Sequence, residues 1–444
     1  MLKILRATYV ESRYVQVLIL SMGLFILAFI VPPLMFIAQG FMALGAVTLL
    51  VDFILLFNIR KGITATRFVP EKLSNGDDNP IRIFIENYYI FSTSIQVIDE
   101  APNQFQLRNT HFDFMLKGRD SQTIDYMLRP TKRGSYEFGV VNVYAKSPIG
   151  FLARRFKCGT PVAIPVYPSY LQMRQYELLA ISSKLTEYGI KKIRRIGHNM
   201  EFEQIKNYVQ GDDIRTINWK ATARNQALMV NNYQDERSQQ VYSLIDKGRV
   251  MKMPFEGLSL LDYAINAALV ISNIAIKKDD KAGLVTFQHK IGHMVKASKQ
   301  SGQMKTILET LYNEKTAYQE TDYSRLHMFV RRKITQRSLL LCFTNFESTF
   351  AMHRQLPYLK SMAKHHLVVV IIFQNTTLNE LVASPARELK TIYKKAVAEQ
   401  MAYDKELIIK ELQKNGIQTI LTSPQNLTVN TINKYLELKS RGLI

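Results

Sequence analysis

The stretch "SQQVYSLID" (238–246) opens a series of short, almost wholly apolar segments in the C-terminal half of the chain. A long run of helical character (259–278) follows it, and then the apolar segment "KAGLVTF" (281–287). Helical stretches then alternate with three more apolar segments, at 338–344, 367–373 and 417–421. Continuous apolar strands separated by helices are typical of a mostly parallel sheet covered on both faces. The sequence therefore predicts a doubly wound α/β domain over residues 236–444.

Ligands of such folds bind outside the carboxyl ends of the strands, so Asp246, Phe287 and Thr344 mark the positions to inspect. A domain whose first strand ends in an aspartate resembles the von Willebrand factor A fold. Members of that fold with a metal site carry D-x-S-x-S after this strand, and hard oxygen ligands of this kind hold Mg²⁺. Here the run is "DKGRVM", in which Gly248 and Val250 replace the serines and a lysine and an arginine enter the loop.

Two further positions of this chain can be compared with the metal-binding von Willebrand A pattern. Asn345 stands where an acid is expected, and Thr321 in "ETDYS" could fill the threonine position. The added positive charge would repel a cation. We therefore expect Asp246, Thr321 and Asn345 to form a degenerate site that binds no Mg²⁺. Whether Thr321 and Asp322 approach Asp246 is left open by the sequence.

Motifs for other chemistry are weak. His289 and His293 in "HKIGH" have the spacing of a helical metal pair, but Gly292 and the preceding strand favour a hairpin. The chain contains no G-x-x-x-x-G-K-[ST], no G-x-S-x-G and no H-E-x-x-H. We therefore expect a protein that is not an enzyme and needs no cofactor.

N-terminal to the α/β domain, a connecting region (169–235) contains "YVQGDDIRTINWKATAR" (208–224). Its residues of interest are Gly211, Asp212, Asp213, Arg215, Trp219 (the only tryptophan) and Arg224. The adjacent acids could be a catalytic pair, a metal site or a structural clamp. Neighbouring cations, among them Lys206 and Lys220, would lower the pKa of both carboxyls, which disfavours a general acid. We favour a clamp or docking surface, with Trp219 packed against the α/β domain.

Earlier still, residues 64–168 contain six or seven short alternating runs separated by polar, glycine or proline turns. Such runs are typical of strands, and this number over about 100 residues predicts a small all-β sandwich. The region carries no catalytic motif, so we expect a structural or protein-binding role.

The N-terminal region (1–63) holds an apolar run from Val15 to Phe57 that is broken at Pro32-Pro33. It has about twice the roughly 20 residues that one membrane span needs, so it predicts a transmembrane helical hairpin. Cations flank both outer ends of the hairpin, at Lys3, Arg6, Arg13, Arg60, Lys61 and Arg67, while the connection has none. The positive-inside rule then predicts a multi-pass protein of the inner (cytoplasmic) membrane with cytoplasmic soluble domains. We expect Asp52 to be solvated or paired with Arg60 or Lys61.

The whole chain of 444 residues has a formal net charge of +21, which fits nucleic acid, anionic lipid or an acidic partner. Basic and aromatic residues are not interleaved in a recognisable nucleic-acid module, so we expect membrane lipid and not nucleic acid. The two cysteines form no framework, which favours a reducing compartment.

The segment 197–236, followed by the strand ending in Asp246, resembles the signature of the domain of unknown function 58 family. The matching positions are Glu201, Phe202, Tyr208, Gly211, Asp212, Asp213, Arg215, Asn218, Trp219, Ala221 and Arg224. "RGSYEFG" and "SPIGF" in the β-rich region extend the resemblance. It implies a bacterial protein that acts with a MoxR-type AAA+ ATPase and other von Willebrand A-like proteins.

Together these features predict a non-catalytic, membrane-anchored scaffold or adaptor. It would present a cytoplasmic A-like domain to a MoxR-type AAA+ ATPase in envelope maintenance or protein maturation. The alternative is a Mg²⁺-dependent enzyme that uses Asp212, Asp213 and Asp246.

Overall fold

The structure is a computed structural model, and it describes residues 7–106, 111–181, 201–210, 212, 214–225, 227–234, 238–316, 318–385 and 388–444. The side chains of 178–181, 201–204 and 232–234 are not described. The chain divides into two compact units, residues 1–167 and 168–444. Each unit is described by itself below.

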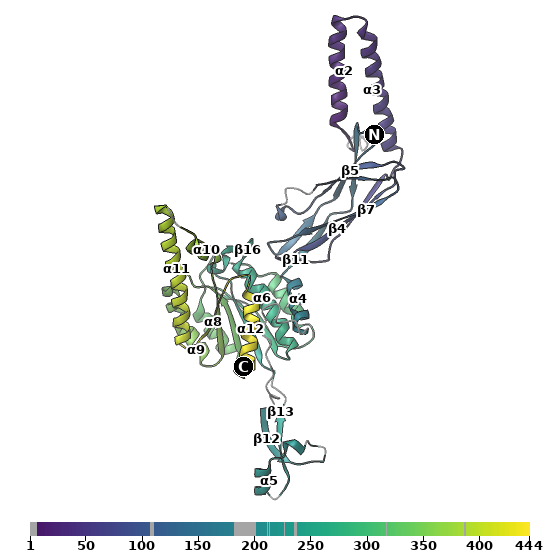
Figure 1. The fold of residues 1–444 in the computed structure, drawn as a ribbon. Coiled ribbons are helices and arrows are strands. Elements are labelled where there is room, and N and C mark those ends of the chain that lie inside the picture. Colours follow the sequence, from purple (N-terminus) through teal and green to yellow (C-terminus); the bar gives the residue numbers. More distant parts are fainter. Residues whose placement is uncertain are drawn as a thin grey trace. The chain divides into compact units, whose positions relative to one another are not determined.

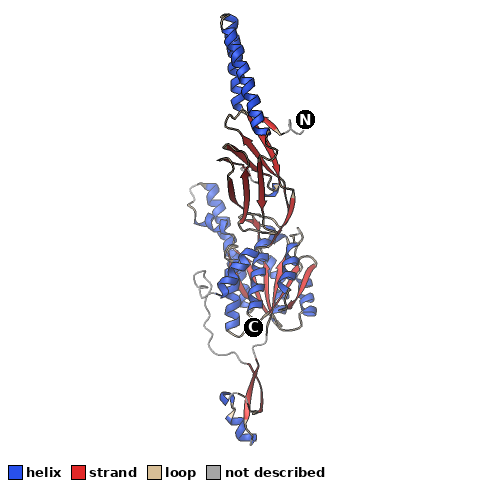
Figure 2. Ribbon diagram, turned by 90° about the vertical axis from the view of Figure 1, so that its right-hand side faces the viewer, coloured by secondary structure: helices blue, strands red, loops and turns tan. Residues whose placement is uncertain are grey.

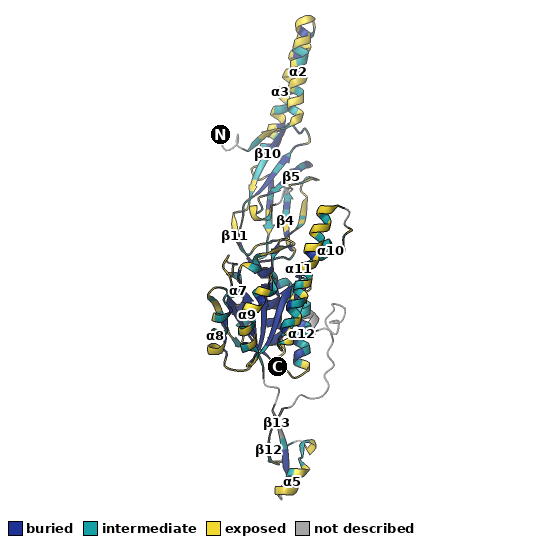
Figure 3. Ribbon diagram, turned by 90° about the vertical axis from the view of Figure 1, so that its left-hand side faces the viewer, coloured by how far each residue is buried: buried dark blue, intermediate teal, exposed yellow. Residues whose placement is uncertain are grey.

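The first unit contains two long apolar helices, α2 (Ser12–Ile30) and α3 (Leu34–Phe57), that pack against each other (Figure 1). Their mean hydropathies reach 2.0 and 2.3, and most of their residues are exposed, so both could span a membrane (Figure 3). Pro33 precedes α3, where a proline is compatible with the start of a helix. Of the flanking cations, Lys3 and Arg6 lie outside the described residues.

Eleven strands of the first unit form a β domain of three small sheets (Figure 2). One sheet has the order β1 (Thr8–Val10), β10 (Leu152–Cys158), β9 (Val141–Lys146), β5 (Thr93–Asp99) and β6 (His111–Leu116). The second joins β2 (Ile63–Phe68), β4 (Asn79–Asn87) and β7 (Ser121–Leu128). The third joins β3 (Leu73–Ser74), β11 (Val162–Tyr167) and β8 (Gly134–Phe138). Strand β1 precedes α2, so the β domain also includes residues N-terminal to the two apolar helices.

The end of α3 is held by the β domain, which contradicts our expectation for Asp52. Asp52 is fully buried, and its carboxylate accepts hydrogen bonds from the backbone of Phe151 and Leu152, at 2.9 and 2.8 Å, and from the Ser147 hydroxyl. Arg60 and Lys61 are not among its partners. The "SPIGF" turn that supplies these donors lies almost 100 residues away in the chain, and local charge therefore gives no sign of the contact.

Arg154 holds the last turn of α3 from a neighbouring position. Its guanidinium donates to the carbonyls of Leu56, Ile59 and Arg60 at 2.5, 2.7 and 3.0 Å. A cation at the carboxyl end of a helix satisfies free carbonyl groups and complements the helix dipole. Asp52 and Arg154 therefore fix the carboxyl-terminal part of α3 to the β domain.

In the second unit, α4 (Tyr170–Ile181) packs on α6 (Leu260–Lys277). The segment after it contains an antiparallel hairpin of β12 (Glu201–Asn207) and β13 (Met229–Gln234). Between these strands lie the 3₁₀ turn η3 (Ile214–Thr216) and the short helix α5 (Trp219–Asn225). The signature residues thus lie on one hairpin, which we call the signature hairpin (201–234).

The main sheet of the second unit has six strands (Figure 1). Their order is β18 (Ile291–Ser298), β17 (Lys281–Phe287), β14 (Gln240–Asp246), β19 (Leu339–Thr344), β20 (Leu367–Phe373) and β21 (Gln418–Thr422). All neighbouring pairs are parallel except β17 and β18. Strand β18 is an antiparallel edge strand that follows β17 through a tight turn. The "HKIGH" turn is a hairpin turn, as Gly292 indicated.

Helices cover both faces of this sheet (Figure 3). One core contains side chains from α6, α7 (Gln303–Tyr312) and α12 (Leu427–Ser440). The other contains side chains from α8 (Tyr323–Lys333), α9 (Thr349–Ala363) and α11 (Leu389–Lys414). Although α6 is apolar and long enough to cross a membrane, 78% of its most apolar window is buried in the first core. A capping box between Ser259 and Asp262 starts it.

Candidate functional site

Asp246 lies at the carboxyl end of β14, the strand at which the order of the sheet reverses. Chain order along the sheet runs outward from β14 in both directions, to β17 on one side and to β19 on the other. In open α/β sheets, the crevice at such a switch point is where ligands bind. The topology therefore places Asp246 at the position where a site is most expected.

The two oxygens of Asp246 are occupied by donors from the protein itself. Oδ1 accepts from the Gly248 amide at 2.8 Å and from the Thr321 hydroxyl at 2.5 Å. Oδ2 accepts from the Thr344 hydroxyl at 2.7 Å, and Thr344 Oγ1 lies 2.6 Å from the Tyr323 hydroxyl. Burial raises the pKa of the Asp246 carboxyl, and the hydrogen bonds from Thr321, Gly248 and Thr344 act in the opposite direction.

The close approach of Thr321 depends on Gly248. A β-carbon at position 248 would lie 2.1 Å from Thr321 Oγ1 and 3.0 Å from Asp246 Oδ1. A serine at this position, as in the metal-binding pattern, would therefore displace the threonine. Glycine lets Thr321 bond directly to the carboxylate, so Thr321 does approach Asp246, a point that the sequence left open. Asp322 does not share in it, since its carboxylate caps α8 through the Arg325 amide.

Asn345 lies on the same edge but serves a different partner. Its side-chain oxygen accepts a hydrogen bond from the Lys405 ammonium, which also donates to the Phe346 carbonyl at 2.5 Å. Burial lowers the pKa of Lys405 to about 8. Lys405, a cation from α11, thus lies at Asn345, the position where the metal-binding pattern described above carries an acid.

A small pocket of about 80 Å³ opens beside this cluster. Asp246, Thr321 and Asn345 contribute to its wall, together with Arg249 and Arg354. Arg354 pairs with Glu320 at 2.9 Å, and Arg249 lies 3.6 Å from Glu347. The pocket is therefore rimmed by alternating charges and is too small for a substrate of ordinary size.

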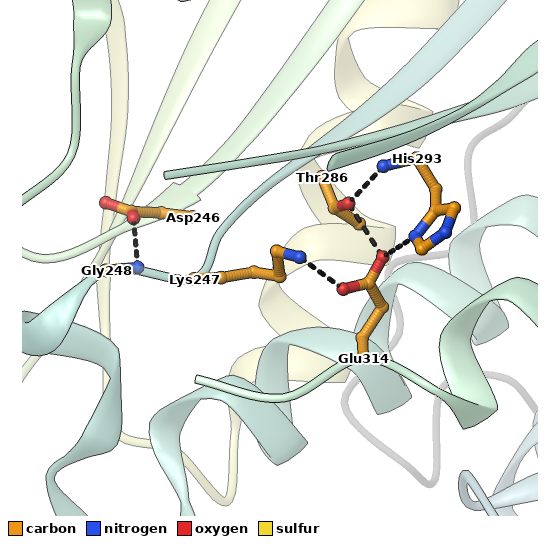
Figure 4. A network of polar contacts seen from close by, with 6 residues as sticks. All are labelled: Asp246, Lys247, Gly248, Thr286, His293 and Glu314. Carbon is orange, nitrogen blue, oxygen red and sulfur yellow. Dashed lines mark hydrogen bonds and ion pairs between the residues drawn. The ribbon is translucent and has the colours of Figure 1, made fainter. Parts of the chain in front are cut away.

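A second polar network lies on the other side of the same strand end, where Lys247 points away from Asp246 (Figure 4). Lys247 Nζ lies 2.6 Å from Glu314 Oε2, and both side chains are buried. Glu314 Oε1 accepts from the Thr286 hydroxyl at 2.7 Å and lies 2.7 Å from His293 Nδ1. These partners outweigh burial and lower the pKa of Glu314. Sequence analysis gave no indication of this network because Glu314 belongs to no motif.

The signature hairpin shows part of the predicted clamp. Asp212 accepts from the Lys206 ammonium at 2.9 Å and from the Val209 amide at 3.1 Å. These hydrogen bonds lower the pKa of the Asp212 carboxyl, as expected. Its described partner is Lys206 and not an arginine. Gly211 and Asp213 lie outside the described residues.

Trp219 begins α5 and is 70% exposed, so it does not pack against the α/β domain as we expected. Ile214 is equally exposed, and Arg224 is exposed near the end of α5. Arg215 lies in η3. Asn218 organises this segment instead: its side chain accepts from the Ala221 amide and donates to the Asn231 side chain. The apolar and basic groups of the hairpin are thus presented outward.

Among the described residues, no group of three or more His, Cys, Asp or Glu side chains is arranged to hold a metal ion. The residues that sequence reasoning missed are the partners of the strand end. Thr344 was noted only as a strand end, and Lys405 and Glu314 come from distant segments. Only a three-dimensional structure brings them to β14.

Residues 204–420 match the family described as "Protein of unknown function DUF58", which confirms the resemblance drawn from the signature. The uncharacterized protein YeaD of Bacillus subtilis (strain 168) is 26% identical over 129 residues, which span 29% of this chain and 31% of that protein.

Two solved structures to which the chain is similar each cover about a quarter of it. A CARDB domain from Pyrococcus furiosus, in complex with di-metal ions, is 11% identical with a TM-score of 0.16, over 23% of this chain and 86% of that one. A PKD domain of an M14-like peptidase from a Thermoplasmatales archaeon is 9% identical with a TM-score of 0.16, over 23% of this chain and 92% of that one. Likenesses of this size support no inference about fold or function.

Proposed function

We propose that this chain, which belongs to the DUF58 family, is a membrane-anchored binding protein that acts without a metal ion. The observation that carries the proposal is the occupation of Asp246. Three internal donors, one amide and two hydroxyls, satisfy its carboxylate. A metal ion would have to replace the Thr321 hydrogen bond, and the Lys405 ammonium already serves Asn345. The strand end is built to be stable without a cation.

The von Willebrand factor A-like interpretation belongs to this proposal. It is supported by the central first strand that ends in Asp246, by helices on both faces and by a sheet that reverses its order at β14. In such a domain, a strand end without its metal still offers a binding face. Arg249, Arg354 and the small pocket provide one here.

The signature hairpin supplies a second binding surface. Trp219 and Ile214 are each 70% exposed, and Val209 is 63% exposed. Exposed aromatic and aliphatic groups close to arginine and lysine are the composition of an interface anchor. Following the family resemblance, we propose that this surface docks a MoxR-type AAA+ ATPase. The chain would act as its scaffold or adaptor on the cytoplasmic side of the inner membrane, in envelope maintenance or protein maturation.

The alternative, a Mg²⁺-dependent enzyme using Asp212, Asp213 and Asp246, is not favoured by the observed contacts. Asp212 is held by Lys206, and Asp246 is 1% exposed with its oxygens occupied. Neither carboxylate offers two free oxygens to a cation.

The test is a pull-down of the tagged full-length protein in mild detergent with ATP and Mg²⁺, read by mass spectrometry. We expect a AAA+ ATPase to be recovered, and its yield to fall about tenfold in the Trp219→Ala, Ile214→Ala double variant, because interface anchors carry most of the binding energy. Leu389→Ala, which removes an exposed apolar group (86% exposed) from α11, is the matched control. Undiminished recovery in the double variant would contradict docking at the hairpin. Recovery of no AAA+ ATPase by folded protein would contradict the scaffold role.

A further inference from the structure

Four connections of the first unit lie at the end of the β domain from which the membrane helices leave. Strand β4 runs towards this end, and β5 leaves it, as their pairing with β7 and β6 shows. The connections 88–92 and 117–120 therefore lie at the same end as 147–151, which bonds to Asp52, and 58–62, which follows α3. Figure 1 shows α2 and α3 projecting from this end.

The loop 88–92 is fixed beside the last turn of α3. The Tyr89 hydroxyl donates to the Leu56 carbonyl at 2.6 Å, and the Tyr89 ring is fully buried. The Arg119 amide donates to the Tyr89 carbonyl at 3.0 Å. A β-carbon at Gly118 would lie 2.1 Å from the Ile90 carbonyl oxygen, so glycine allows the two loops to touch. Both loops are therefore held in a defined position relative to the helices.

These two loops expose an unusual combination of side chains. Ile90 is 77% exposed and Tyr88 is 48% exposed, although both adjoin the buried Tyr89. Lys61, Lys117 and Arg119 are exposed around them. The acidic neighbours are Asp120 and Glu86, and the Tyr88 hydroxyl donates to the Glu86 carboxylate at 2.8 Å. Exposing an isoleucine side chain to water at a loop tip is unfavourable. Aliphatic and tyrosine side chains flanked by cations are instead typical of the interface of an anionic bilayer.

We propose that this end of the β domain lies on the anionic membrane leaflet, with Tyr88 and Ile90 in the headgroup layer. Two observations identify the bilayer as the surface that covers these loops. The same end of the β domain carries the two membrane helices, and three cations surround the apolar side chains. The inference rests on the proposed membrane placement of α2 and α3. With these contacts, the β domain would be held in a fixed position on the bilayer and not only linked to it through a flexible connection.

The test uses full-length protein in a Trp219→Phe background, reconstituted into liposomes whose phosphatidylcholine and phosphatidylglycerol chains are brominated near the headgroup. A single tryptophan is placed at Ile37 in α3, at Ile90, or at Met127, which is exposed near the distal end of β7. We expect Ile37→Trp and Ile90→Trp each to lose about half of their fluorescence or more, because bromines quench on contact and interfacial side chains reach about 5–10 Å into the boundary. Met127→Trp should keep its intensity.

The three positions separate the possible failures. Quenching at 37 without quenching at 90 would overturn this inference alone, whereas no quenching at 37 would overturn the membrane placement itself. If Ile90→Trp does not fold, Tyr88→Trp gives the same readout. Reversing the charge of Lys61, Lys117 and Arg119 to glutamate in the Ile90→Trp protein should weaken the quenching, and unchanged quenching would overturn the role of anionic lipid.

Discussion

Asp246 and Glu314 are both buried at the carboxyl end of β14, at 1% and 2% exposure, but they have different kinds of partners. Asp246 accepts hydrogen bonds from two hydroxyls and an amide, none of which carries a charge. Glu314 is paired with the Lys247 ammonium and bonded to Thr286. Burial dominates at the first carboxyl and raises its pKa, while the partners dominate at the second and lower its pKa. Asp246 and Lys247 are adjacent in the chain, yet the first is a buried acid among neutral donors and the second pairs with the buried acid Glu314.

At this strand end, both buried carboxyls are satisfied by groups of the protein itself. Where a bound cation would balance the buried carboxylate, this chain uses hydroxyl donors on one side of β14 and a lysine on the other. Glu314 is therefore buried as part of an ion pair, whereas Asp246 is buried among neutral donors.

The largest expected effect comes from removing that cation. Lys247→Met leaves the Glu314 carboxylate buried without its ion pair, so we expect the free energy of unfolding to fall by about 3–5 kcal/mol. Arg249→Met is the matched control, because the Arg249–Glu347 pair is exposed and should be worth less than about 1 kcal/mol. Urea unfolding of the full-length protein in detergent measures both. Equal losses would show that Lys247 and Glu314 do not form the buried pair.

A smaller effect is expected on the Asp246 side. Gly248→Ala places a β-carbon 2.1 Å from Thr321 Oγ1, and relieving this overlap should cost about 1–3 kcal/mol. Replacing Thr321 by alanine removes the overlapping atom. The double variant should therefore lose less stability than the sum of the two single variants, as a double-mutant cycle would show. Strict additivity would mean that Gly248 and Thr321 are not coupled through this contact.

The two acids should also respond to pH in opposite directions. The folded pKa of Glu314 lies below its ordinary value of 4.5, so its stabilising contribution is fully present above that value and is lost as the pH falls through the folded pKa. The folded pKa of Asp246 lies above 3.8, so its contribution is present below that value and is lost as the pH rises through the folded pKa.

Two substitutions separate these contributions. Relative to the unsubstituted protein, Asp246→Asn should gain stability as the pH rises from about 3 to 7, whereas Glu314→Gln should lose it, by about 1.4 kcal/mol for each unit of pKa shift. Thermal unfolding across this range measures both. Parallel pH profiles of the two variants would contradict the opposite environments.

Much of the fold could be predicted from local patterns. The run 15–57 and the apolar segments 238–246 and 281–287 agree with the observed helices and strands because burial dictates their composition. The resemblance to the von Willebrand A pattern named Thr321 as a candidate for the threonine position, but only the structure shows that it bonds to Asp246. The edge strand β18 has no continuous apolar run, since five of its eight residues are polar or small, and only the hairpin signal at Gly292 pointed to it.

The contacts that define the candidate site could not be predicted in this way. Thr344 is 98 residues from its partner Asp246 in the chain, and Lys405 is 60 residues from its partner Asn345. Asp52 bonds to a turn about 100 residues away. No local periodicity records such contacts. The prediction that Trp219 packs against the α/β domain was also wrong, since an aromatic residue in a signature does not by itself indicate burial.

The most direct test of the central claim is the thermal stability of the full-length protein in detergent, titrated with MgCl₂ at constant ionic strength. A ligand that binds only the folded state raises the melting temperature in proportion to its binding free energy. Because the Asp246 oxygens are already occupied, the account predicts no change up to millimolar Mg²⁺. A saturable rise that disappears in Asp246→Asn would contradict it and would identify a working metal site at the end of β14.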